Sequence, residues 1–215
     1  MRGSLRLLQL ADSAFPAGAY AFSDGLETLT VRGEVRTAAD LGAFLRGQLA
    51  HGWGVQDAPA CALAWGAGAG ALRDLDALLD DLKLVEGPRR ASLRVGANLR
   101  RAARALWPAE EGALSPTRHH ATTFGALAGA LGAARETAVT AYVSAWLLGR
   151  ATSATRLMRL GGLEAQACAA GCEARALACV QAALRATPED LGGFSPLLDL
   201  AAGEQPGLES RLFQT

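Results

Sequence analysis

The residue types best suited to metal chemistry are two cysteines, Cys168 and Cys172, four positions apart in a segment with helical periodicity. Residues at i and i+4 share one helix face, so two thiolates at this spacing could bind a soft metal ion together. Cys179 lies two turns further along the same stripe. The alternative is that each cysteine acts as a small buried hydrophobe in an alanine-rich stripe. We favour packing, so we predict no metal site and keep Cys168 and Cys172 as weak candidates.

Groups for acid–base or nucleophilic catalysis are sparse. His119 and His120 are adjacent, so on a helix their rings diverge by about 100° and cannot both bind one ion. The chain has no Gly-x-Ser-x-Gly elbow, and its only lysine, Lys83, follows no glycine loop of the phosphate-binding type. We therefore predict no catalytic centre and interpret the two histidines as a helix start that packs in the core.

The elements that would position any site are helices. Half of the 215 residues are apolar, the chain has no isoleucine, and alternating β-branched segments are missing. A chain of this length fits one domain. We predict an all-α, single-domain, orthogonal or irregular bundle of about 8–10 helices without a sheet.

Charge and hydropathy argue against several classes of partner. The 21 basic residues balance 21 acidic ones, and they are scattered along the sequence instead of forming a stripe, so we expect no nucleic-acid partner. Asp12 and Pro16 interrupt the only candidate signal sequence, and the apolar run at 61–72 is shorter than the roughly 20 residues of a membrane span. The cysteine spacing does not suggest a disulfide framework. We expect a cytoplasmic protein with reduced thiols and no membrane contact.

Capping residues and Pro/Gly breaks divide the chain into helices. Thr37 and Asp40 resemble a capping box, and Thr187-Pro188 predicts one last short helix. Glycines such as Gly125 predict close helix packing. We expect residues 1–203 to form the domain and residues 204–215 to form a tail that is mobile when free. Besides the helix that follows Thr37, helices are predicted over residues 5–10, 22–31, 57–65, 72–85, 89–106, 119–131, 136–158 and 162–186.

Two segments have less obvious packing roles. Residues 15–27 combine a Pro/Gly loop, aromatic side chains and a Ser/Asp entry to a helix. This loop either plugs the bundle or forms a surface for a partner or a second copy. Residues 209–213 place arginine, leucine and phenylalanine after a polar linker. This tail docks either on its own domain or on a partner.

These segments also carry a resemblance to a known family, the urease accessory protein UreF. The sequence of residues 7–27 resembles the N-terminal pattern of that family, and the similarity recurs at 90–96, 124–132, 153–166 and 210–213. Departures are Ala14 where a proline is common, Ala21 where a serine is usual, and Arg159 where a proline often stands. Residues 199–204 also lack the histidine that usually precedes the tail glutamate.

The resemblance implies an all-helical homodimer without enzymatic activity that bridges the accessory protein UreD (also called UreH) and the GTPase UreG. It further implies help in delivering nickel to apo-urease and in gating GTP hydrolysis by UreG, with no cofactor bound stably and nickel only in transit. Two alternatives stay open: a direct nickel metallochaperone and a generic helical adaptor. The resemblance assigns these residues to partner or dimer interfaces: Pro16, Gly18, Tyr20, Ser23, Gly25, Glu27, Arg156, Gly161, Gln166, Arg211 and Phe213.

Overall fold

The fold is all-α, as predicted, in a computed structural model that describes residues 1–19, 22–209 and 212–213. Within these ranges there are twelve α-helices and no strand, more helices than the 8–10 expected, because a four-residue helix at Glu111–Leu114 was not predicted and the segment 162–186 forms two helices. They are α1 (Arg2–Ala11), α2 (Leu26–Val31), α3 (Ala38–His51), α4 (Trp53–Ala64), α5 (Ala69–Leu82), α6 (Glu86–Leu106), α7 (Glu111–Leu114), α8 (His120–Ala130), α9 (Arg135–Leu157), α10 (Gly162–Ala170), α11 (Glu173–Arg185) and α12 (Pro196–Glu204). Short 3₁₀ turns occupy Pro108–Glu110, Pro188–Asp190 and Gln205–Gly207.

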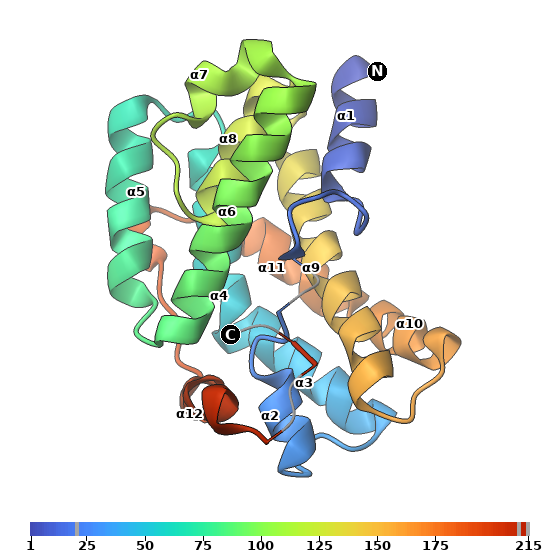
Figure 1. The fold of residues 1–215 in the computed structure, drawn as a ribbon. Helices are drawn as coiled ribbons and strands as arrows, with labels where there is room; N and C mark the ends of the chain where they lie inside the picture. The colour runs from blue at the N-terminus through green and yellow to red at the C-terminus, as the bar shows by residue number, and fades with distance from the viewer. Residues whose placement is uncertain (20–21, 210–211, 214–215) are drawn as a thin grey trace.

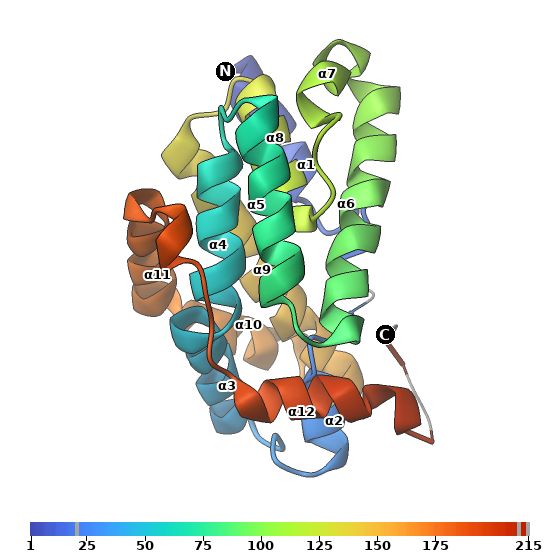
Figure 2. The ribbon, with the colours of Figure 1, turned by 90° about the vertical axis from the view of Figure 1, so that its left-hand side faces the viewer.

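Helices α4 and α8 form the centre of the bundle, with α6, α9 and α11 packed around them (Figures 1 and 2). Every residue of α8 from Ala121 to Ala128 is buried, which explains why this helix has no polar face. The two central axes approach closely at Gly125, where an added Cβ would lie 3.0 Å from the Cβ of Ala64. The close packing predicted from the glycines is therefore confirmed at this crossing.

The predicted capping box begins α3. The Thr37 hydroxyl accepts the Asp40 amide hydrogen at 3.2 Å, and the Asp40 carboxylate accepts the Thr37 amide hydrogen at 2.9 Å. The next helix was predicted to begin at residue 57, which is wrong, because α4 begins at Trp53 and contains Pro59 in its interior. Proline cannot donate to the carbonyl four residues earlier. That carbonyl, of Val55, accepts the Gly192 amide hydrogen at 3.3 Å instead.

Three other predicted boundaries are wrong. The segment 162–186 is two helices, α10 and α11, bent by 51° at the intervening turn, so the three cysteines do not share one straight stripe. The helix predicted over 22–31 begins only at Leu26. Thr187-Pro188 begins a capped 3₁₀ turn, and the last α-helix begins later, at Pro196.

Among the described residues, no single helix is long and apolar enough to cross a membrane. The bent pair α10 and α11 has the length and apolar composition of a membrane span only when the two helices are taken together.

The arginines are not scattered evenly, contrary to the expectation from sequence. Helix α6 contains six arginines and a single acidic residue, Glu86. Its buried face, which includes Val95 and Leu99, packs against α8. Because burial takes the apolar positions, the charge is concentrated on the remaining, outward surface of α6.

Candidate functional site

The loop between α1 and α2 is held in place by α9. Asp24 has a φ of 51° and precedes Gly25, whose φ is 83°, so two successive residues adopt the left-handed region and turn the chain into α2. The Asp24 carboxylate accepts the Trp146 indole N–H at 3.1 Å and pairs with Arg150 at 2.9 Å. Arg150 also donates to the carbonyl oxygens of Phe22 and Ala19. One buried guanidinium on α9 therefore fixes both the backbone and a side chain of the loop.

Glu27 connects this loop to the C-terminal tail. Its side chain, in the first turn of α2, is only 2% exposed. It accepts a hydrogen bond from the Gln205 side-chain amide at 2.9 Å and one from the Leu212 backbone N–H at 2.5 Å. A buried carboxylate needs such donors to offset its lost hydration. Glu27 is therefore an anchor for the tail.

Phe213 inserts its ring beside α9. It is 5% exposed, and the guanidinium of Arg156 lies 5.0 Å from its ring centroid, a cation–π contact. A second link, between Arg32 and Glu204, ties the start of the tail to the end of α2. The part of the tail that the structure describes thus lies against the chain's own domain.

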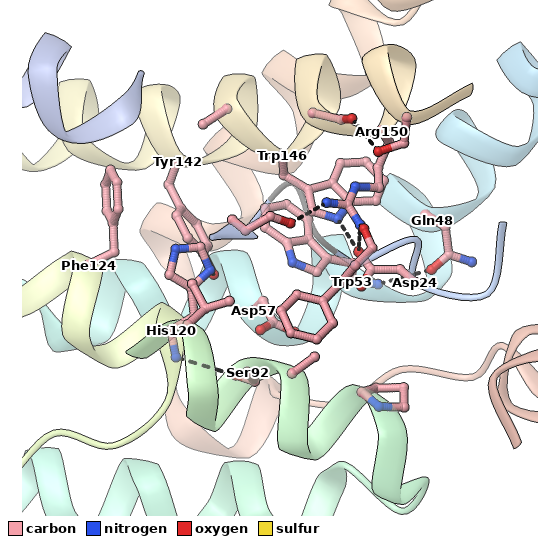
Figure 3. A pocket seen from close by; sticks show the side chains of 18 of the residues that line it. Asp24, Gln48, Trp53, Asp57, Ser92, His120, Phe124, Tyr142, Trp146 and Arg150 are labelled. Atoms are coloured by element: carbon pink, nitrogen blue, oxygen red, sulfur yellow. Dashed lines mark hydrogen bonds and ion pairs between the residues drawn. The ribbon is translucent and has the colours of Figure 1, made fainter. Parts of the chain in front are cut away.

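A cavity of about 700 Å³ lies between the loop, α4, α6 and α9. Figure 3 shows Trp53, Tyr142 and Trp146 on its wall, with Asp24 and Arg150 beside them. The two tryptophan rings stack at 4.7 Å, and Trp53 also contacts Tyr142 at 5.2 Å. The wall combines an aromatic cluster with charged groups, so it is amphipathic and not simply apolar.

Two ion pairs lie on this wall. The ammonium of Lys83 lies 2.7 Å from the Asp57 carboxylate and 3.3 Å from the Gln56 side-chain oxygen. Asp24 is paired with Arg150 in the same way. These two pairs are neutral, and Asp12, Arg156 and Asp199 are further charged groups on the wall.

His120 and Tyr142 are both uncharged at neutral pH. Burial lowers the pKa of His120 to about 3, helped by the nearby positive charges of Lys83 and Arg150. Burial raises the pKa of Tyr142 well above its usual value. The Tyr142 hydroxyl lies 3.4 Å from His120 Nδ1, so the hydroxyl donates and the neutral ring accepts.

A Ser–His–Asp chain lies at the start of α8. Ser92 Oγ is 3.0 Å from His119 Nδ1, and His119 Nε2 is 3.1 Å from the Asp80 carboxylate. Ser92 Oγ also accepts the His120 backbone N–H at 3.3 Å, and Asp76 accepts the His119 backbone N–H at 3.0 Å. The order resembles a hydrolase triad. Ser92 and Asp76 nevertheless accept the free amide hydrogens at the N-terminus of α8, which agrees with the interpretation of both histidines as a helix start.

The structure brings together some of the residues assigned by resemblance but not all of them. Arg156, Gln166 and Phe213 line the cavity. Ser23 and Gly25 are buried in the loop, Pro16 is exposed, and Gly18 is half-buried with a positive φ. Gly161 is exposed at the N-terminus of α10 and does not line the cavity. Tyr20 and Arg211 lie outside the described residues.

The cysteines point toward backbone carbonyls. Cys168 Sγ lies 3.3 Å from the Ala38 carbonyl oxygen, and Cys172 Sγ lies 3.9 Å from that of Gly42. Burial raises the pKa of both thiols, which disfavours the thiolate that a metal needs. The described residues contain no group of three or more His, Cys, Asp or Glu side chains suited to hold a metal ion.

Sequence reasoning missed the groups that organise this site. Arg150 and Trp146 fix the loop, yet the loop residues that they bind are more than 120 residues away in the chain. Lys83 was noted only as a lysine without a glycine loop. The one signal in the sequence was that Lys83 is the only lysine, and this did not reveal its buried partner Asp57.

Comparisons with known proteins agree with the resemblance. The family model UreF matches residues 35–173. A urease accessory protein UreF of Mesorhizobium japonicum is 33% identical over 98% of the chain and 96% of its own length. Proteins of the same name from Methylobacterium sp. and Methylorubrum populi are 34% and 32% identical, over 99% and 100% of this chain and 88% and 100% of their own lengths.

Proposed function

Because the chain belongs to the urease accessory protein UreF family, whose role is in urease maturation, we propose that it is a non-catalytic scaffold that bridges UreD/UreH and the GTPase UreG. In this proposal it helps to deliver nickel to apo-urease as a homodimer and gates GTP hydrolysis by UreG. The catalytic work belongs to its partners. The family membership supports the accessory role. The structure supports the loop and the tail as the surface that first contacts a partner.

The observation that carries the proposal is the shared anchor of the loop and the tail. Glu27 binds the tail through Leu212 and Gln205, while Asp24, three residues earlier, binds α9. A partner that takes up Phe213 breaks the Arg156 contact and the Leu212 hydrogen bond together. Phenylalanine and arginine are residue types that dominate binding interfaces. We therefore assign the tail and the loop to the UreD/UreH contact.

The test is a pull-down of UreD/UreH and UreG by the full chain, by a chain lacking residues 204–215, and by Phe213→Ala. We expect the truncated chain and Phe213→Ala to lose UreD/UreH. Leu106→Ala is the matched control, because Leu106 is also an apolar residue, 47% exposed, but lies at the far end of α6. Normal capture by a folded truncated chain would refute the tail assignment.

We further propose that nickel is only in transit and is not held at Cys168 or Cys172. The competing function, a direct metallochaperone, requires a thiolate site there. Calorimetry with Ni²⁺ on the wild type and on Cys172→Ala separates the two. A tight site that Cys172→Ala abolishes would favour the metallochaperone. Both chains are expected to give the same weak heat of binding, because the thiols stay protonated.

A further inference from the structure

Helix α6 presents a row of arginines to solvent. Arg90, Arg94, Arg101 and Arg104 are all exposed, with the exposed Ala97 in the middle of the row. With Ala97 included, these positions are three or four residues apart and therefore lie on one face, and the row is about 21 Å long at the helical rise of 1.5 Å per residue. Figures 1 and 2 both show α6 on the outside of the bundle, next to α7. A chain with no net charge therefore has a strongly basic face.

Only the ends of this row are neutralised. Arg90 pairs with Glu86 at 3.5 Å, and Arg104 pairs with Glu111 at 2.6 Å. Within the described ranges, Arg94 makes no ion pair, and the Arg101 guanidinium donates only to Asn98, at 3.1 Å. Arginines three or four residues apart repel one another, so this arrangement costs stability in the free protein.

A small pocket opens at the C-terminal half of the row. It has a volume of about 370 Å³ and is lined by Arg100, Arg101 and Arg104 of α6 and by Leu114 and Ser115 at the end of α7. The Nε of Arg100 is shielded from solvent and has no hydrogen-bond partner among the described residues. An unpaired, desolvated guanidinium nitrogen is unfavourable until an anion reaches it. Three guanidiniums against one carboxylate, that of Glu111, give the pocket a positive charge.

We propose that the arginine face of α6 binds a short acidic segment of another protein, with one carboxylate of that segment seated in the pocket at Arg100. The proposal does not depend on the role in urease maturation. The ion pairs with Glu86 and Glu111 neutralise the two ends of the row, so a continuous phosphate backbone would find few unpaired arginines along it. A short acidic peptide needs only the unpaired arginines in the middle of the row and at the pocket.

The test measures binding of a fluorescent Glu/Ala peptide of about 14 residues, which spans the row as a helix, by anisotropy at physiological salt. The variant is Arg94→Glu/Arg101→Glu. The matched control is Arg175→Glu/Arg185→Glu on α11, which makes the same change in net charge at exposed positions. All four substitutions are on the surface, and thermal melts check that both variants remain folded.

We expect the α6 variant to weaken peptide binding by about tenfold or more and the α11 control by less than about twofold. Arg100→Gln should weaken binding by about threefold or more, because it removes the group in the pocket. Equal losses in the α6 variant and the α11 control would overturn the proposal. Tighter binding of a single-stranded DNA of matched length would also overturn it, because the face would then be a nucleic-acid site.

Discussion

The buried pair of Lys83 and Asp57 offers the sharpest test of how the cavity wall is stabilised. Their side chains are 7% and 5% exposed, with the charged atoms 2.7 Å apart. At this distance two unit charges attract by about 6 kcal/mol for an effective dielectric constant of about 20. Desolvation of both ions offsets much of that attraction, so the pair contributes little net stability. Removal of one partner is different, because the other charge is left buried alone.

We expect Lys83→Met to lower the free energy of unfolding by about 3–5 kcal/mol, the usual cost of an uncompensated buried charge. In a chain of this size that loss lowers the melting temperature by about 6–20 °C. The double variant Asp57→Asn/Lys83→Met should recover most of the loss, because it leaves no unpaired charge at these two positions. The measurement is urea unfolding followed by far-UV circular dichroism.

The control is Arg90→Met, which breaks the exposed pair with Glu86 and should cost less than about 1 kcal/mol. Two results would refute the reasoning about the wall. One is a loss below about 1 kcal/mol for Lys83→Met, which would mean that solvent in the cavity hydrates Asp57. The other is a double variant no more stable than the single one.

Three further predictions concern the same region. Because the pKa of His120 is lowered to about 3 from an ordinary value of 6.5, the unfolded chain binds the extra proton as the pH falls through this window, and stability decreases. The free energy of unfolding should fall by about 1.4 kcal/mol per pH unit below about pH 6, and urea titrations at pH 7 and 5 should show a smaller slope for His120→Gln. Gly25→Ala should destabilise by at least about 1–2 kcal/mol, measured by thermal melts, since Gly25 has a φ of 83° and a Cβ there would lie 2.6 Å from a Leu198 methyl; unchanged melting would contradict this. Glu27→Gln keeps only one acceptor oxygen for two donors, so limited proteolysis should cleave the tail faster than in the wild type, and an unchanged cleavage rate would count against Glu27 as the anchor.

The fold class followed from the sequence because local signals agreed with the tertiary packing. The Thr37–Asp40 box and the apolar periodicity depend on neighbours within one or two turns. Predicted helix boundaries were wrong where a distant segment supplied a hydrogen bond that the local sequence lacks. Pro59 reads as a helix start, but Gly192 satisfies the carbonyl that the proline leaves free, so the helix continues through it.

The site was only partly predictable for the same reason. Residues 15–27 and 209–213 stood out because their residue types are unusual for packing. The buried partners of these segments did not, because Arg150 and Gln205 are ordinary residues in helical or turn sequences, and each acts across more than 120 residues. The basic face of α6 was missed because charge was judged along the chain, whereas burial of one helix face sorts the charge in space.

Because Asp24 and Glu27 are only three residues apart, displacement of the tail affects the conformation of the loop. Asp24 is fixed to α9 through Arg150 and Trp146, and Glu27 is fixed to the tail through Leu212. The three-residue separation includes Gly25, which packs against Leu198 of α12. Displacement of the tail leaves the Glu27 carboxylate without two of its donors in a buried site, which is unfavourable. The first turn of α2 must then rearrange or gain other donors, so displacement of the tail and the conformation of the loop are energetically coupled.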